Sequence, residues 1–308
     1  MFFKLGKKPF NAMGVDLSPD GLHMIQLANG RGDLRLVAKG YRQRPADIES
    51  RTAAWQHWVV DALRDLLAQE GFMGKSIQAA MAPEDVIIET VKKAKLKDPK
   101  FPGVILSRVG IRVSPECSQD NLVIKAIPIG SDHAMVMATD KELINRYLAM
   151  FERSGLEIKA ISTWPEALHQ SYLRFFGQTN ADQRHAIMLL DILKDCTNVV
   201  ICRHTQMLFA RSLPIGSTGL EGETAINRLS LELSTCRTDF QGLYPDQVVS
   251  RVVFLSGNAV NASVYLTMAK QLEIQAQVGD CMAAVEGATT NGSVDRGSWA
   301  TAFGLGLL

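Results

Sequence analysis

The segment RVVFLSGNAV, residues 251–260, has the residue types of a phosphate-binding turn. An apolar run that indicates a buried strand ends at Gly257, and a helical pattern follows over residues 261–272. A glycine there lets the backbone approach a ligand closely, and the next helix offers free amides and a positive dipole end to a phosphate. The same arrangement is also an ordinary strand-to-helix connection in α/β proteins. This segment alone leaves both interpretations open.

Two aspartates occupy the same place in two similar parts of the chain. Asp16 closes the apolar run MGV, and Asp191 closes the apolar run IMLL. Aspartate commonly caps or orders a tight turn, so a purely structural role is the alternative to a role in ligand binding. The repetition predicts that the two acids face each other across a cleft between two halves of the molecule.

Other residues that could support catalysis are scattered. None of the six histidines forms an i, i+4 pair with an acid of the kind found in metalloproteases. Cys196 lies beside Thr197, but no general base for a thiol nucleophile is identifiable. The five cysteines have no metal-site spacing, which indicates reduced thiols in a cytosolic protein. We therefore predict no catalytic residue.

Length and charge restrict the class of protein. The 308 residues are enough for two lobes with separate cores, and 46% hydrophobic and 21% charged residues are ordinary globular values. A formal net charge of +1 gives no general attraction to nucleic acid, so no nucleic-acid partner is expected. No apolar run is long enough to span a bilayer. The N-terminal MFFKLGKKPF is interpreted as a basic tail.

Each half of the chain begins with a predicted three-stranded meander. In residues 11–45 the turn clusters SPDG and NGRGD separate three alternating runs, and in residues 185–213 the strands are separated by short polar turns. A helix over residues 52–71 and a strand over residues 76–82 follow the first meander. A long helix over residues 219–240, the strand of residues 251–257 and another helix follow the second.

The region between the halves indicates an inserted subdomain. Its pattern predicts a strand over residues 83–94, a helix over 100–113, two strands over 121–129 and 134–140, and an amphipathic helix over 141–156. A strand over 156–164 and a helix over 165–176 then return to the first half, and polar residues 177–184 are interpreted as a link.

Taken together, these patterns resemble the actin-like ATPase superfamily and, more narrowly, the PilM- and MshI-like proteins of type IV pilus assembly, which are related to FtsA. The resemblance is carried by KKPFNAMGVDLSPDGLHMIQL, by LELSTCRTDFQGLYPDQVVSRVVFLSGNAV and by the closing SWATAFGLGLL. It covers essentially the whole chain, weakly in the middle.

The resemblance implies an α/β protein with the actin-like ATPase fold: two lobes, each with a five-stranded mixed sheet and helices, plus an inserted small α+β subdomain. The expected division is residues 1–81 and 156–178 for the first lobe, 82–155 for the inserted interaction subdomain, and 179–308 for the second lobe.

The resemblance also implies a degenerate nucleotide site. The residues aligned with it are Asp16, Ser18, Asp191, Thr197, Glu232, Gly257 and Ala259, with Asp16 and Asp191 as candidate Mg²⁺ ligands. Pro19 removes an amide donor from the first turn, and Leu193 is bulky where the family tends to have glycine. We expect weak or absent binding of ATP and Mg²⁺, and no efficient hydrolysis.

The function implied is that of a cytoplasmic scaffold in type IV pilus or related secretion system biogenesis. The expected partner is a PilN-like bitopic membrane protein, whose cytoplasmic N-terminal peptide would lie in a groove between the inserted subdomain and the first lobe and would recruit the chain to the inner membrane. The resemblance leaves room for contacts with pilus motor ATPases and for weak self-association. Two alternatives stay open: an active ATP-dependent small-molecule kinase and an FtsA-like polymerising ATPase.

Overall fold

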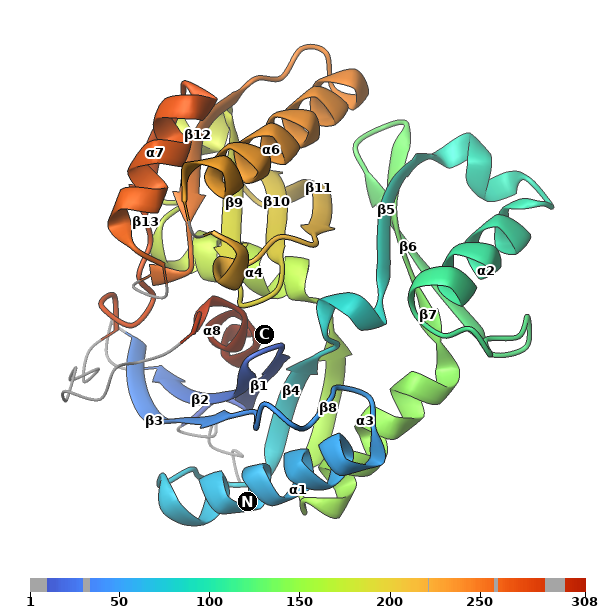
Figure 1. Ribbon diagram of the computed structural model, residues 1–308, viewed down its shortest axis with the longest axis vertical. Coiled ribbons are helices and arrows are strands. Elements are labelled where there is room, and N and C mark those ends of the chain that lie inside the picture. Colours follow the sequence, from blue (N-terminus) through green and yellow to red (C-terminus); the bar gives the residue numbers. More distant parts are fainter. Residues whose placement is uncertain (1–9, 30–33, 221, 258–259, 286–296) are drawn as a thin grey trace, which may run out of the picture.

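The computed structural model describes residues 10–29, 34–220, 222–257, 260–285 and 297–308. Two five-stranded mixed sheets form the centres of two lobes (Figure 1). The first has the order β3-β2-β1-β4-β8 and the second β11-β10-β9-β12-β13. In each, the meander strands pair antiparallel and the later strands pair parallel. The predicted fold class is confirmed, although β13 had not been predicted.

The strands have the following bounds: β1 Met13–Ser18, β2 Gly21–Asn29, β3 Leu34–Gln43, β4 Ser76–Ala80, β8 Glu157–Ser162, β9 Ala186–Ile192, β10 Thr197–Arg203, β11 Gln206–Leu213, β12 Val249–Phe254 and β13 Gln275–Val278. Every residue of the central strands β1 and β9 is buried, because helices cover both faces of each sheet.

The helices outside the insert have the following bounds: α1 Ala53–Gln69, α4 Trp164–Phe175, α5 Asn180–Arg184, α6 Glu223–Leu243, α7 Ala262–Leu272 and α8 Ala300–Leu307. The Thr52 hydroxyl caps α1 by accepting a hydrogen bond from the Trp55 amide. Residues 177–184, expected to be a polar link, include the short helix α5. None of the helices in the described ranges is long and apolar enough to cross a membrane.

Helices α4 and α8 lie between the two sheets, and each packs on the sheet of the other lobe. Helix α8, near the end of the chain, packs on β1, β2 and β4 of the first sheet, whereas α4 packs on β9, β10 and β11 of the second (Figure 1). The two helices also pack against each other. The division into lobes drawn from the sequence stays a prediction, and these contacts add that each sheet is covered partly by a helix from the other side of that division.

Backbone meets backbone on both sides of α8. A Cβ atom on Gly14 of β1 would lie 2.1 Å from the Ala302 carbonyl oxygen, and one on Gly304 would lie 1.8 Å from the Ala167 carbonyl oxygen of α4. Both distances are far below van der Waals contact. Only glycine allows this spacing, so these two positions fix how closely the two lobes approach each other.

The inserted subdomain is a three-stranded antiparallel sheet with two helices. Its elements are β5 Ile87–Lys92, α2 Phe101–Arg112, β6 Leu122–Ile129, β7 His133–Asp140 and α3 Lys141–Arg153, with strand order β5-β7-β6. Strand β5 is shorter than predicted, because 3-10 turns occupy Pro83–Asp85 (η1) and Lys93–Lys97 (η2) on either side of it. Helix α3 packs on α1 and β8 of the first lobe.

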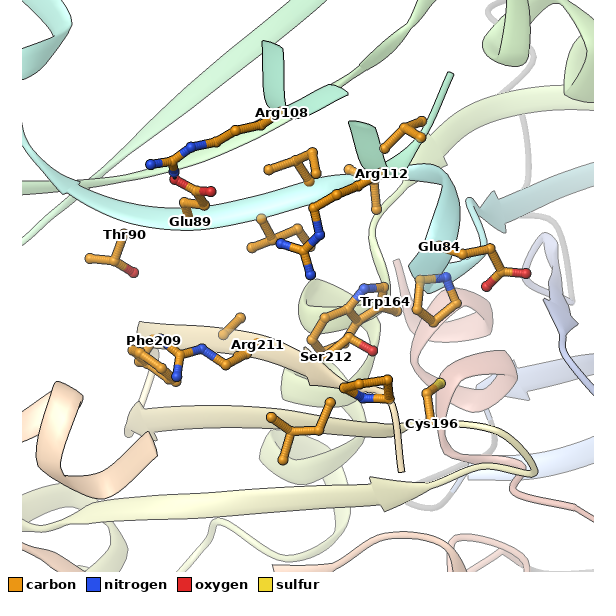
Figure 2. A pocket seen from close by; sticks show the side chains of 18 of the residues that line it. Glu84, Glu89, Thr90, Arg108, Arg112, Trp164, Cys196, Phe209, Arg211 and Ser212 are labelled. Atoms are coloured by element: carbon orange, nitrogen blue, oxygen red, sulfur yellow. The ribbon is translucent and has the colours of Figure 1, made fainter. Parts of the chain in front are cut away.

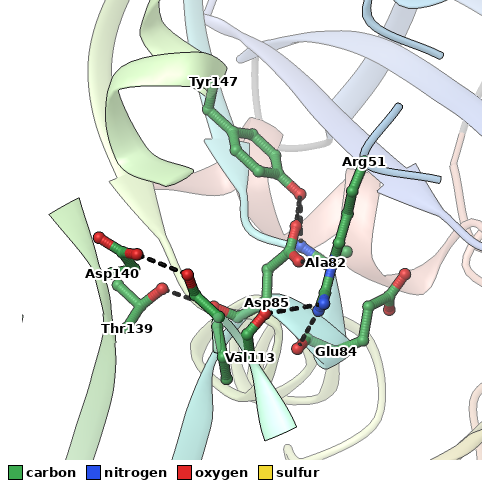
Figure 3. Close-up of polar contacts among 9 residues, drawn as sticks. Arg51, Ala82, Glu84, Asp85, Val113, Thr139, Asp140 and Tyr147 are labelled. Atoms are coloured by element: carbon green, nitrogen blue, oxygen red, sulfur yellow. Dashed lines mark hydrogen bonds and ion pairs between the residues drawn. The ribbon is translucent and has the colours of Figure 1, made fainter. Parts of the chain in front are cut away.

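A buried ion pair attaches the insert to the first lobe (Figure 3). Arg51 Nε lies 2.5 Å from Asp85 Oδ1, and Asp85 is 1% exposed. The Tyr147 hydroxyl of α3 donates to Asp85 Oδ2 at 2.7 Å, and Thr139 of β7 donates to the Asp85 carbonyl oxygen at 2.6 Å. One residue, Asp85, thus ties three parts of the insert to the loop before α1.

The packing around α8 gives a first prediction. Gly304→Ala places a methyl group inside the contact with α4, so we expect the free energy of unfolding, measured by chemical denaturation, to fall by about 1–3 kcal/mol. Gly110→Ala in α2 is the matched control, because its added methyl meets nothing within 4 Å. The control should gain about 0.5–1 kcal/mol from helix propensity. Equal effects of the two changes would contradict the packing argument.

Candidate functional site

The structure brings Asp16 and Asp191 together at the junction of the lobes. Asp16 lies in β1 and is 7% exposed, and Asp191 lies in β9 and is 0% exposed. Burial, followed by repulsion from Asp191, raises the pKa of Asp16 well above its usual value. Burial raises the pKa of Asp191 to about 6, although hydrogen bonds from the Ser298 and Ser256 side chains oppose the rise. Each of the two acids therefore binds a proton more readily in the folded protein than in the unfolded chain.

The first turn, at Ser18, is covered by the segment before α8. The Ser18 hydroxyl donates to Asp20 Oδ1 at 2.7 Å and lies 3.3 Å from His23 Nδ1. The buried His23 ring lies 4.6 Å from the ring of Tyr41 and 4.8 Å from that of Trp299, between centroids. A Cβ atom on Gly297 would lie 2.5 Å from Asp20 Oδ2. Residues 297–299 thus fill the space next to this turn.

The second turn uses its polar groups internally. The Ile192 amide donates to Ser256 Oγ at 2.5 Å, and the Leu193 amide donates to the Cys196 carbonyl oxygen at 2.8 Å. The Thr197 hydroxyl donates to the Ile215 carbonyl oxygen at 2.7 Å. These groups are the ones that would have to face a phosphate, and in this conformation they are already paired.

Of the remaining sequence-predicted residues, Gly257 follows Ser256, which contacts Asp191, whereas Glu232 lies on α6. Gly257 ends the β12 turn with a φ of 54°, and its carbonyl oxygen accepts a hydrogen bond from the Tyr265 hydroxyl at 3.0 Å. Glu232 lies half-buried on α6, close enough to Cys236 to contribute to the raised pKa of that thiol. Ala259 falls outside the described residues.

Asn198 is a site residue that sequence reasoning missed. It pairs with Asp191 across β9 and β10, and both of its side-chain polar atoms are buried with no hydrogen-bond partner among the described residues, as is Asp191 Oδ2. The signal in the sequence is a polar amide within the otherwise apolar run TNVVIC. Unpaired buried polar atoms are costly, so these polar groups reduce the stability of the core.

These residues do not fit a bound magnesium nucleotide. The amides of the second turn donate within the protein, residues 297–299 pack on the first turn, and both acids are buried. Among the described residues, no group of three or more His, Cys, Asp or Glu side chains could hold a metal ion. The weak binding expected from Pro19 and Leu193 stays a prediction, to which the packing around both turns adds a structural reason.

A second candidate site is a groove of about 1100 Å³ between the insert and the second lobe (Figure 2). Its two long walls are β5 and β11, each the edge strand of its own sheet. Pro19, Arg44 and Ser50 are its lining from residues 1–81. The sequence had predicted a groove between the insert and the first lobe, whereas this cavity lies mainly against the second lobe. Which strand lies at the edge of a sheet is decided only when the sheets assemble, so the position of the groove could not be predicted from the sequence.

Apolar and charged side chains share the lining of this groove. The apolar part includes Ile88, Trp164, Phe209 and Leu213, and Arg112 points into the space between them (Figure 2). Two arginines there are paired with acids: Arg108 with Glu89, and Arg211 with Asp239 at 2.7 Å.

Three polar side chains of the lining bear on its chemistry. Trp164 Nε1 and Thr90 Oγ1 are buried and have no hydrogen-bond partner within the part of the chain that the structure describes. Burial raises the pKa of the Cys196 thiol to about 12, which makes it a poor nucleophile. The groove therefore offers unpaired strand edges, apolar surface and unused donors, which is the chemistry of peptide binding.

Comparisons with known proteins address the fold. No family model matches the chain, and no curated protein matches it. Among solved structures, the chain is similar to a PilM–PilN type IV pilus biogenesis complex, with a TM-score of 0.73 and 15% identity over 97% of this chain and 98% of that chain.

Two further structures are similar at lower TM-scores. A protein from Bacteroides thetaiotaomicron with an actin-like ATPase fold and unknown function has a TM-score of 0.53 and 10% identity, over 94% of this chain and 96% of that chain. Ethanolamine utilization protein EutJ from Carboxydothermus hydrogenoformans has a TM-score of 0.51 and 13% identity, over 98% and 90%. The chain thus has the actin-like ATPase fold, in a form similar to that of the PilM–PilN complex.

Proposed function

We propose that this chain is a PilM-like scaffold of type IV pilus assembly or a related secretion system, and that it binds an extended peptide from a membrane-anchored, PilN-like partner. The observation that carries the proposal is the groove between β5 and β11. The similarity to a structure of a PilM–PilN complex supports the choice of partner class.

Two edge strands facing one cavity favour an extended ligand. Each edge has backbone amides and carbonyls on the side away from its own sheet, and a peptide that adds a strand satisfies them. Backbone pairing would supply affinity, and the apolar lining near Trp164 and Phe209 would supply side-chain selectivity.

The spacing of the walls restricts how such a peptide enters. Parts of β5 and β11 have Cα atoms within 8 Å of each other. A strand paired with both edges needs about 9.6 Å, which is twice the usual strand separation. The peptide must therefore pair with one edge alone, or the insert must move away from the second lobe. In the second case, binding of the partner would change the position of the insert relative to the second lobe.

Nucleotide has a minor role in this proposal. The groups that would bind phosphate are already paired within the protein, so any affinity for ATP and Mg²⁺ is weak and hydrolysis is not part of the function. The partner peptide, rather than a γ-phosphate, would then control the arrangement of the insert and lobes. Recruitment to the inner face of the membrane follows from the partner.

The two buried acids give a prediction about pH. The folded-state pKa of Asp191 is raised from 3.8 to about 6. Its contribution to the stability of the fold is therefore most favourable below pH 4 and is lost as the pH rises through 6. We expect Asp191→Asn to remove a penalty of about 3 kcal/mol at pH 7, measured by urea unfolding at pH 4 and pH 7. Asp61→Asn, on the exposed surface of α1, should leave the pH dependence unchanged. An unchanged pH dependence in the Asp191 variant would show that the acid is not strained.

The packing of the phosphate turns gives a prediction about nucleotide affinity. Titration calorimetry with Mg-ATP should give a dissociation constant weaker than about 1 μM, which corresponds to roughly 8 kcal/mol of binding. A tighter constant, or a rise in thermal stability on adding Mg²⁺ alone at pH 8, would mean that residues 297–299 leave the cleft and that the site is intact.

The groove gives a prediction about the partner. A labelled synthetic peptide with the cytoplasmic N-terminal sequence of the PilN-like protein from the same genome should bind, measured by fluorescence anisotropy. Ser212→Trp fills the centre of the groove from β11 and should weaken binding by about tenfold or more. Gln206→Trp is the matched control, because Gln206 is exposed on the same strand and does not line the groove. Equal binding by the two variants would place the peptide elsewhere, and no binding by the native chain would remove the partner.

A further inference from the structure

The inserted subdomain has a concentration of lysines that the net charge of the chain conceals. Residues 91–100, VKKAKLKDPK, contain five lysines and one aspartate, whereas the whole chain has a formal charge of +1. Lys93 is held in place, since its Nζ donates to the carbonyl oxygens of Gly130 and Ser131 at 3.0 and 2.8 Å. Lys92, Lys95, Lys97 and Lys100 are exposed, and none forms an ion pair with a described residue.

Exposed aliphatic side chains lie on the neighbouring helix α2. Val104 is 48% exposed and Ile111 is 80% exposed, the latter being the highest value among the exposed large hydrophobic residues. Their spacing of seven residues places both on one face of the helix, and Lys100 lies one turn before Val104 on the same face. The opposite face of α2 is buried at Ile105 and Val109. The helix thus exposes two aliphatic side chains, with Ser107 and Arg108 between them, and a lysine just before its start.

The lysines and the exposed aliphatic side chains of α2 belong to one surface. A hollow of about 430 Å³ lies there, lined by Lys95 of η2, by Asp98, by Phe101, Val104, Ile105 and Arg108 of α2 and by Glu89, Thr90 and Val91 of β5. In Figure 1, α2 lies at the outer margin of the molecule, on the side of the insert away from the second lobe. We call this surface, formed by η2 and the exposed side of α2, the basic face.

We propose that the basic face docks on the anionic surface of a lipid bilayer. Lysines near such a surface are attracted to acidic headgroups, and exposed aliphatic side chains between them can enter the boundary with the acyl chains. A nucleic acid would use the charge but would gain little from an exposed Ile111. The hollow itself is lined by two acids as well as two bases, so the attraction to acidic headgroups comes from the exposed lysines of residues 92–100.

This inference goes beyond the proposed function and does not depend on it, because the bilayer is contacted by the chain itself. Attraction through a few lysines is weak in isolation and is screened by salt. A partner that holds the chain close to the membrane would make the same weak contact effective by raising the local concentration. The basic face would then set the orientation of the insert relative to the membrane.

The test is flotation of the full chain with vesicles, with no partner peptide present. We expect binding to phosphatidylcholine vesicles that contain phosphatidylglycerol, and none to pure phosphatidylcholine. The variant K95Q/K97Q/K100Q should bind about 100-fold more weakly, from about fivefold for each lysine removed. K75Q/K159Q/K270Q removes the same charge from exposed positions outside the insert and should bind like the native chain. Ile111→Ser should weaken binding, whereas Leu266→Ser, 72% exposed on α7, should not.

Three outcomes would overturn the proposal. Equal loss in the two triple-lysine variants would mean that only total charge matters. Binding that survives K95Q/K97Q/K100Q but is lost in K4Q/K7Q/K8Q would assign the membrane contact to the N-terminal tail. Displacement of the chain from vesicles by tRNA, together with tRNA binding that depends on the same lysines, would make nucleic acid the ligand. Because the peptide assay contains no lipid and the flotation assay no peptide, failure of one leaves the other proposal intact.

Discussion

The close packing of backbone against backbone around α8 is the constraint on which the rest of the molecule depends. Gly14 lets β1 approach α8, and Gly304 lets α8 approach α4, so no side chain separates these layers at the two contacts. Because α8 belongs to the first sheet and α4 to the second, these contacts determine the distance between the lobes. Asp16 and Asp191 meet because the strands that carry them are brought together by this packing.

The same constraint explains why the nucleotide site is closed. Residues 297–299 lead directly into α8, so the packing that positions α8 also places Trp299 beside His23 and Gly297 beside Asp20. In the second turn, Leu193 is buried and its amide is paired within the hairpin. Burial, followed by repulsion from Asp191, raises the pKa of Asp16 and so favours its protonated form. An arrangement of this kind suits a fixed scaffold better than a nucleotide-controlled switch.

The sequence predicted the elements better than it predicted their contacts. Both meanders, α1 and the strands and helices of the insert follow from apolar periodicity and turn residues, because these signals are local. The pairing of Asp16 with Asp191 was predicted from the repeated meander, whereas the close contact of Gly14 with Ala302 was not, because no local signal links residues so far apart in the sequence. The position of the groove, the orphaned Asn198 and the exposure of Ile111 depend on which faces become covered after assembly. The lysines of residues 91–100 are evident in the sequence, but the net charge of the chain gives no indication of them, because acids elsewhere balance them.

In the proposed function, the insert would connect the two kinds of contact that a scaffold recruited to a membrane needs. Arg51 and Asp85 fix it to the first lobe, and its far end reaches the second lobe, where the His133 ring lies 5.5 Å from that of Tyr244 on the C-terminal side of α6. Strand β5 forms a wall of the groove, and α2, which packs beside it, carries the basic face. Arg108 lines both the groove and the hollow of the basic face. A peptide that displaced β5 from β11 would therefore also shift α2, so partner binding and membrane contact would be coupled through a single helix and strand.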